Sequence, residues 1–92
     1  MRIISQNGAI DVPYEMSAIR NDDNVIILNM AGETGKGSVI ARYSTSEKAQ
    51  KAMDMLREKY KDYAKATNKS NFFTMFDYPI VFQFPQDEDV EV

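Results

Sequence analysis

The feature that most constrains the fold is a run from Ser44 to Ala66 that contains neither glycine nor proline. Apolar side chains recur along it at helical spacing, and charged side chains fill the positions between them. The apolar set is Ala49, Ala52, Met53, Leu56, Tyr60 and Tyr63. The pattern predicts one amphipathic helix over residues 44–66, which at 1.5 Å per residue is roughly 30–35 Å long. A helix of this length either lies across a whole sheet or extends toward a partner.

The start of this helix carries a capping-box pattern, Ser44 followed by Glu47. In such a box each side chain accepts a hydrogen bond from the other residue's unpaired backbone amide. The face opposite the apolar stripe mixes lysine and arginine with aspartate and glutamate, which is typical of a solvated helix surface.

The first 43 residues predict an antiparallel meander of strands. Asn7-Gly8 lies between two strand-like runs and favours a hairpin. A short strand over residues 16–20, a turn over 21–24 and a central strand over 25–30 follow. In the last strand, residues 38–44, Val39 and Ala41 are expected on one face and Ile40 and Arg42 on the other. The connections are too short for parallel crossovers, so antiparallel pairing is expected.

The remaining residues divide into an aromatic segment with a last strand, residues 67–84, and an acidic tail, residues 85–92. The tail is expected to be mobile. Together these patterns predict a single domain of 92 residues in the α+β class. We expect one antiparallel sheet of about five or six strands with one long amphipathic helix packed on it.

Composition excludes several function classes. The chain has no cysteine and no histidine, so it contains neither a disulfide nor a serine–histidine or cysteine–histidine catalytic pair. We therefore expect no enzymatic activity, no cofactor and no metal. No apolar run approaches the ~20 residues that cross a bilayer, so we expect no membrane partner and a cytoplasmic location. The net charge is −3, and four of the fourteen acids lie in the last six residues. Even without those four acids the chain has no large excess of basic residues, so we expect no strong nucleic-acid binding.

The loop Ala31 to Ser38, AGETGKGS, resembles a phosphate-binding loop at first sight. A P-loop requires glycine where Met30 stands and serine or threonine where Gly37 stands, and it precedes a helix rather than a strand. These failures favour a flexible hairpin tip, from which Lys36 can still reach an anionic ligand.

Residues 72–84 hold six of the ten aromatic residues. Phe72, Phe73, Phe76 and Tyr78 are either core or an exposed surface that mediates oligomerisation or stacks a nucleobase. Arginines such as Arg2, Arg20 and Arg42 pair with phosphate oxygens. The candidate ligand-binding set is therefore Arg20, Lys36, Arg42, Phe72 and Phe73.

Three phrases carry a family resemblance: MRIISQNGAIDVPYE at the start, IARYSTSEKAQKAMDMLREKY through the helix, and FQFPQDEDVEV at the end. They cover about half the chain, which resembles a group of small proteins encoded by phages and prophages of Gram-positive bacteria. The resemblance implies a phage accessory protein that acts in the host cytoplasm. It transfers no catalytic residue.

Small non-enzymatic phage proteins commonly counter host defence, so the first functional hypothesis is an anti-defence protein. In this hypothesis a homo-oligomer sequesters a host nucleotide immune signal at a subunit interface. Two alternatives remain open: an inhibitor that binds a host defence protein directly, like an anti-CRISPR, and a phage structural or regulatory adaptor with no defence role.

Overall fold

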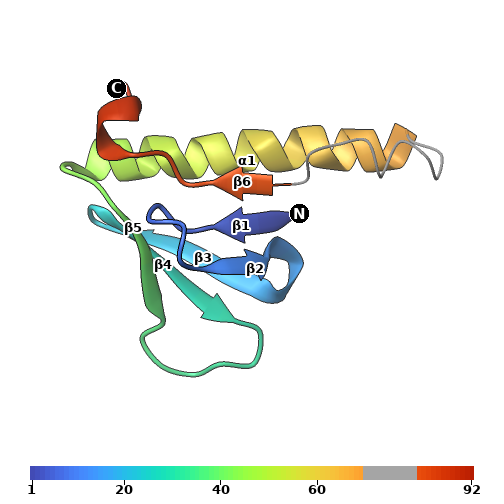
Figure 1. Cartoon of the computed structure of the whole chain (residues 1–92), viewed down its shortest axis with the longest axis horizontal. Coiled ribbons are helices and arrows are strands. Elements are labelled where there is room, and N and C mark those ends of the chain that lie inside the picture. The colour runs from blue at the N-terminus through green and yellow to red at the C-terminus, as the bar shows by residue number, and fades with distance from the viewer. Residues whose placement is uncertain (70–80) are drawn as a thin grey trace.

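The computed structural model describes residues 1–69 and 81–92, which form an α+β fold of two three-stranded sheets and one long helix (Figure 1). Sheet A has the strand order β2 (Asp11–Pro13), β1 (Arg2–Ile4), β6 (Val81–Gln83). Sheet B has the order β3 (Ser17–Asp22), β4 (Val25–Met30), β5 (Ser38–Arg42). Helix α1 spans Ser46–Lys69, and two 3₁₀ turns, η1 and η2, span Tyr14–Met16 and Asp87–Asp89.

The prediction of an α+β fold with one long helix is confirmed, but the prediction of a single sheet is wrong. After Pro13, which has no backbone N–H to donate to a ladder, the chain enters η1 and leaves sheet A. Strand β3 then begins a separate antiparallel meander with β4 and β5. The expectation of purely antiparallel pairing is also wrong, because β6 returns beside β1 in parallel orientation.

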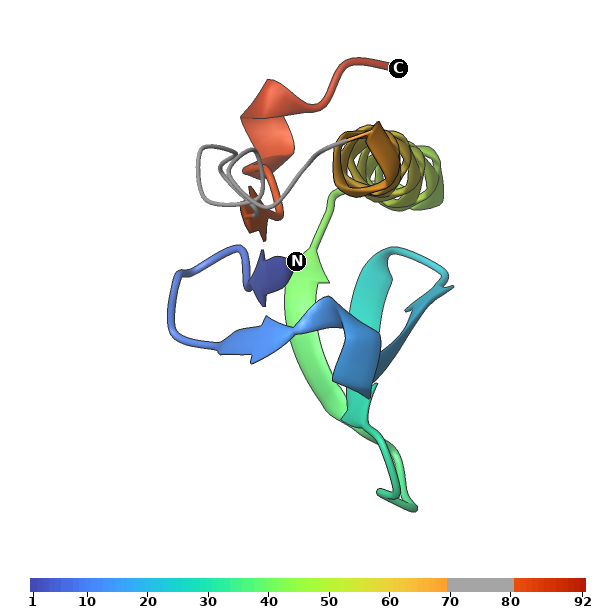
Figure 2. The same ribbon diagram turned by 90° about the vertical axis from the view of Figure 1, so that its right-hand side faces the viewer.

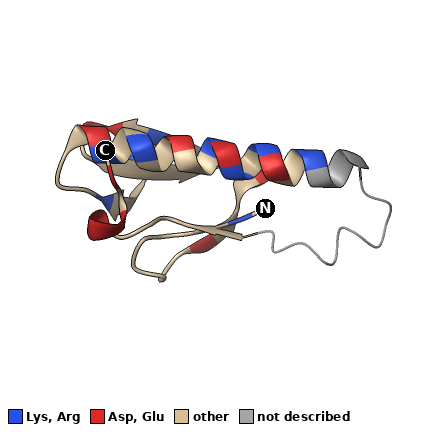
Figure 3. Ribbon diagram, turned by 90° about the horizontal axis from the view of Figure 1, so that it is seen from above, with Lys and Arg blue, Asp and Glu red and all other residues tan. Residues whose placement is uncertain are grey.

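Helix α1 confirms the predicted amphipathic helix and continues three residues beyond the predicted end, to Lys69. Its start differs from the predicted capping box. The side chain of Thr45, not Ser44, accepts the hydrogen bond from the Lys48 N–H, at 3.1 Å, as an N-cap residue does. Along the exposed face, acidic and basic side chains alternate as the sequence pattern indicated (Figure 3).

The core lies where α1 meets the two sheets. Seen end-on in Figure 2, the helix lies above the strands, with β1 and β6 on one side and β3 and β4 on the other. The buried set comprises Met1, Ile3, Ile26, Leu28, Ile40, Ala41, Tyr43, Ala49, Ala52, Met53, Leu56, Phe82, Phe84 and Val90. The two alanines in the first turns let the helix backbone approach the sheet, while Leu56 fills the space further along. Truncating a leucine in such a position typically costs 2–5 kcal/mol.

The C-terminal segment is packed, which corrects the prediction of a mobile acidic tail. Phe84 and Val90 are buried in the core. The Ser44 N–H donates to the Asp87 carboxylate at 2.7 Å, and the Lys48 ammonium contacts the same residue. The hydrogen bond from Ser44, with support from Lys48, lowers the pKa of Asp87 below its ordinary value of 3.8. The segment therefore closes over the start of α1.

Tyr43, the residue after β5, links this segment to sheet B. Its hydroxyl donates to the Pro85 carbonyl at 2.9 Å. Burial, and then the nearby Asp87 carboxylate, raise the pKa of Tyr43 to about 12, so the hydroxyl keeps its proton and its role as a donor at neutral pH.

A β-bulge in β5 overturns the predicted facing of its side chains. Ile26 pairs with Ala41 but Ile27 pairs with Val39, which leaves Ile40 as the extra residue. A bulge puts two consecutive residues opposite one. Ile40 and Ala41 are consequently both buried, whereas Val39 is 49% exposed.

The β4–β5 loop, residues 31–37, confirms the hairpin prediction, and hydrogen bonds join it to the end of β4. The Glu33 N–H donates to the Met30 carbonyl, and the Asn29 side chain donates to the Gly35 carbonyl. Gly37 has a φ of +81°, and a Cβ there would lie 2.7 Å from the Leu28 carbonyl oxygen and from Asn29 Oδ1. The glycine at position 37 is therefore required by close backbone approach.

Replacing Gly37 by alanine tests this packing against Gly32, whose φ is +85° but whose Cβ would meet nothing within 4 Å. Both substitutions carry the left-handed backbone penalty of about 1–2 kcal/mol. Gly37→Ala adds overpacking, which costs about 1–3 kcal/mol more. Denaturant unfolding should therefore find Gly37→Ala clearly less stable than Gly32→Ala. Equal losses of stability in the two variants would contradict the close approach of the backbone at Gly37.

Asp87→Asn tests the docking of the C-terminal segment. Because the pKa of Asp87 is lowered in the folded protein, the ionised carboxylate stabilises the fold above the unfolded-state pKa. This stabilisation is lost as the pH falls through the lower folded-state value. Thermal unfolding from pH 7 to pH 2 should give a lower Tm for the variant at neutral pH, with the difference shrinking below about pH 4. A difference that is constant with pH would refute the contact.

Candidate functional site

Strand pairing brings together the residues of one face of sheet B, which we call the outer face because it is opposite α1. Residues paired across antiparallel strands point to the same side of a sheet. Arg20, Ile27 and Val39 form one such row, and Asp22, Val25 and Arg42 form a second. Ala18 and Asn29 complete the face. Ile27 is 9% exposed but does not join the core cluster, as expected on this side.

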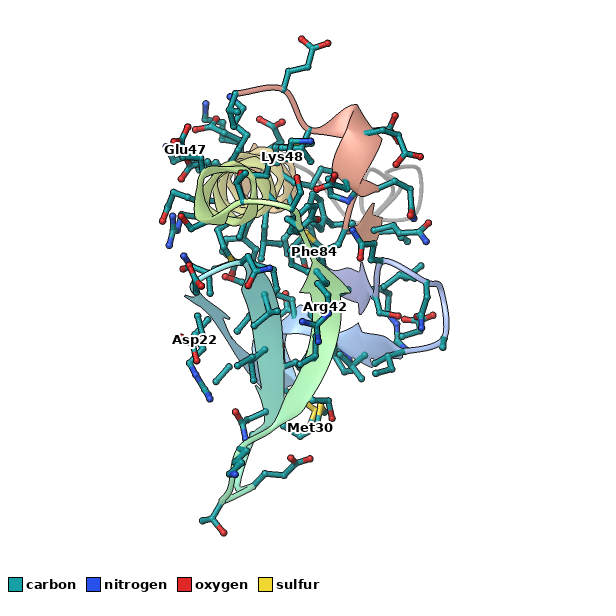
Figure 4. The ribbon with its side chains drawn as sticks, turned by 90° about the vertical axis from the view of Figure 1, so that its left-hand side faces the viewer. Asp22, Met30, Arg42, Glu47, Lys48 and Phe84 are labelled. Atoms are coloured by element: carbon teal, nitrogen blue, oxygen red, sulfur yellow. The ribbon has the colours of Figure 1, made fainter. Side chains whose placement is uncertain are left out.

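Arg20 and Arg42 therefore share the outer face, which one sequence could not establish. Figure 4 shows Arg42 on β5, below the helix, with Asp22 on the other side of β4. Both arginines are exposed. They lie two strands apart and in different rows of the sheet, and Asp22 shares the row of Arg42, so the two arginines do not form a single clamp.

The Arg20 side chain is partly engaged within the molecule. Its Nη1 donates to Asn29 Oδ1 at 3.0 Å and its Nη2 donates to the Lys36 carbonyl at 3.2 Å. The guanidinium thus links β3, β4 and the β4–β5 loop. This use as a loop support leaves fewer N–H groups for a phosphate than the sequence analysis assumed.

Lys36 lies in the β4–β5 loop, which extends away from helix α1 in both side views (Figures 1 and 2). Residues 31–39 are all exposed. Since Arg20 bonds the Lys36 carbonyl, the backbone of Lys36 is anchored at the border of the outer face while its exposed side chain supplies a third cation there.

Arg42 borders a small cavity of about 170 Å³ between β5 and the β1–β2 loop. Its lining residues are Gln6, Asn7, Val39, Ile40, Ala41 and Arg42. Ligand pockets for whole small molecules usually measure about 300–1,000 Å³. The cavity is therefore large enough for one chemical group and too small for a nucleotide.

Gln6 and Asn7 are site residues that sequence reasoning missed. The Arg42 N–H donates to Gln6 Oε1 at 3.0 Å, and Gln6 Nε2 donates back to the Arg42 carbonyl at 3.1 Å. Asn7-Gly8 was assigned only a turn, and Gly8 does have a positive φ, of +78°. Nothing in the local pattern signalled a contact to a strand more than thirty residues away.

Phe72 and Phe73, with Phe76 and Tyr78, lie outside the described residues. Arg2 belongs to sheet A, where its Nε donates to Asp11 Oδ1 at 2.8 Å.

Two other kinds of site are absent from residues 1–69 and 81–92. These ranges contain no group of three or more acidic side chains placed to hold a metal ion. They also contain no helix with the length and apolar character needed to cross a bilayer.

Comparisons with protein-family models, curated proteins and solved structures give no significant match.

Gln6→Glu tests whether this side chain fixes the Arg42 backbone, with Gln86→Glu as the matched control. The glutamate has the same shape but places an oxygen against the carbonyls of Arg42 and Pro85, which now receive bonds from Nε2. Each hydrogen bond lost costs about 0.5–1.5 kcal/mol, since the Pro85 carbonyl keeps its bond from the Tyr43 hydroxyl and the Arg42 carbonyl lies at an exposed edge.

Gln86 donates one hydrogen bond, to the Gln6 carbonyl at 2.7 Å. Chemical unfolding should therefore find Gln6→Glu, which loses two bonds, about 1–3 kcal/mol less stable than the parent, and Gln86→Glu, which loses one, less affected, at about 0.5–1.5 kcal/mol. Equal losses of unfolding free energy in the two variants would contradict the role of Gln6 in fixing the Arg42 backbone.

Proposed function

We propose that this chain is a phage-encoded, non-enzymatic anti-defence protein that acts in the host cytoplasm. In this proposal it sequesters a nucleotide immune signal of the host at an interface between two copies. The observation that carries the proposal is the gathering of Arg20, Arg42 and the Lys36 loop on the outer face of sheet B. Guanidinium and ammonium groups on one open face suit the phosphates of a nucleotide.

The openness of this surface supports a site shared by two copies. The cavity beside Arg42 accommodates one group, so the rest of a nucleotide would lie over the exposed strand surface, against Val39. A second copy placed over the outer face would exclude water from the ligand and strengthen its contacts with the arginines. The lack of histidine and cysteine in the sequence favours binding over chemical conversion of the signal.

Direct inhibition of a host defence protein is the second candidate. Val39, on the edge strand β5 of the outer face, is 49% exposed, and the fully exposed loop 31–37 lies beside it in the chain. An exposed apolar side chain with arginines around it is a common composition for a protein–protein interface.

Ligand capture tests the proposal. The purified protein should be exposed to lysate from infected cells and then heated, and the released small molecules identified by mass spectrometry. Purified immune nucleotides should also raise the Tm. A ligand present at 100 times its Kd stabilises by about 2.7 kcal/mol, which corresponds to a rise of roughly 10–20 °C for a domain of this size.

The control is a pair of double variants with the same change of net charge. Arg20→Gln/Arg42→Gln should abolish the ligand-induced rise relative to its own unliganded Tm. Arg57→Gln/Lys61→Gln, which alters two exposed helix cations paired with Asp54 and Glu58, should preserve it. If no nucleotide is released and none raises the Tm, the sequestration hypothesis is wrong; pull-down of one host defence protein in a complex that depends on Val39 would then support the inhibitor.

A further inference from the structure

We propose that the cavity beside β5 is an oxyanion-binding subsite. The Arg42 guanidinium is its anion contact and the Asn7 side-chain amide is its second donor. This inference deepens the proposed function, on which its choice of ligand rests: the oxyanion is a single phosphate group of the sequestered nucleotide.

Arg42 is distinguished from the other arginines by its free guanidinium. Each of the other three bonds a neighbouring side chain: Arg2 with Asp11 at 2.8 Å, Arg20 with Asn29 at 3.0 Å, and Arg57 with Asp54 at 3.1 Å. Within residues 1–69 and 81–92, the Arg42 guanidinium has no hydrogen-bond or ion-pair partner, although its backbone is bonded. Its N–H groups are therefore available to an external oxyanion.

The position from which this side chain extends is fixed on both edges of β5. On one edge Arg42 pairs with Val25 of β4. On the other, the Gln6 side-chain amide bonds both the N–H and the carbonyl of Arg42. An anchored backbone limits the entropy lost when the guanidinium binds a ligand. Gln6 is thus a positioning residue for Arg42.

The orientation of the Asn7 amide is set by its own hydrogen bonds. Its Oδ1 accepts from Ser5 Oγ at 2.7 Å and from the Ala9 N–H at 3.0 Å. The remaining polar group of this side chain is the amide NH2 at Nδ2, which only donates. No partner for it occurs in the described parts of the chain, so it adds a second donor of the kind an anion requires.

The size and lining of the cavity favour one phosphate group. Its volume is about 170 Å³, and none of its six lining residues is acidic. Val39 adds an apolar wall that is 49% exposed. A phosphate held by Arg42 and Asn7 would leave the sugar and base to lie along Val39, outside the cavity.

Two substitutions remove the proposed contacts with little effect on the fold. Arg42→Gln shortens an exposed side chain and removes its charge. Asn7→Asp retains Oδ1 and its two hydrogen bonds but replaces the Nδ2 donor with an anionic oxygen. Arg57→Gln is the control, since each of the three substitutions lowers the net charge by one and Arg57 is an exposed residue of α1 that does not line the cavity.

The experiment titrates the full-length ¹⁵N-labelled protein with sodium phosphate and, separately, with adenosine monophosphate, at constant ionic strength, and follows the amide resonances. The parent should respond at Asn7, Ala41 and Arg42. Arg42→Gln and Asn7→Asp should each weaken phosphate binding about tenfold or more, since a hydrogen bond to a charged group contributes about 1.5–3 kcal/mol. Arg57→Gln should change it less than twofold.

Phosphate binding that survives Arg42→Gln and Asn7→Asp, or that falls equally in Arg57→Gln, would overturn the subsite. The proposed function is tested separately from the subsite. If phosphate binding depends on Arg42 but no immune nucleotide binds more tightly than phosphate, the subsite stands and the sequestration function fails. If a nucleotide binds equally well to the parent and both cavity variants, the function stands and this subsite is wrong.

Discussion

The side chain of Gln6 completes the open edge of β5, and the arrangement of the two sheets depends on this contact. A primary amide carries one acceptor and one donor group, as a peptide group does. Gln6 Oε1 accepts from the Arg42 N–H while Nε2 donates to the Arg42 carbonyl, as the facing residue of an antiparallel strand would. An unpaired strand edge is otherwise a site of uncontrolled association.

The same residue joins three segments that are distant in the sequence. Its backbone N–H donates to the Ile40 carbonyl, its Nε2 also donates to Pro85, and its own carbonyl accepts from Gln86. The β1–β2 loop, β5 and the C-terminal segment consequently meet at one point beside the core. The same contacts hold the proposed ligand surface in place, because Gln6 bonds the backbone of Arg42 and lines the cavity beside it.

Local sequence patterns correctly predicted the elements whose structure depends on one segment of the chain. Helical spacing from Ala49 to Tyr63 predicted α1, and the apolar run of residues 25–30 predicted β4. The features that local patterns did not predict are formed by long-range contacts. The bulge at Ile40, the docking of Asp87 on Ser44, and the parallel return of β6 to β1 all depend on segments that no local pattern relates.

The same distinction between local patterns and long-range contacts applies to the candidate site. Arginine chemistry named Arg20 and Arg42 as candidate ligand-binding residues, but only strand register placed them on one face. Sequence reasoning could not foresee that Arg20 supports the Lys36 loop or that Asn7 lines a cavity with Arg42. Both contacts arise from folding the chain back on itself.

Amide hydrogen exchange at Arg42 tests the central role of Gln6 most directly, because this N–H lies on an edge of β5 that no strand within residues 1–69 and 81–92 covers. The account predicts that the Arg42 amide exchanges as slowly as the amides in the interior of β4, since breaking its bond to Gln6 Oε1 requires separating the loop from the sheet. Exchange at the rate of the exposed loop amides of residues 31–36 would contradict it.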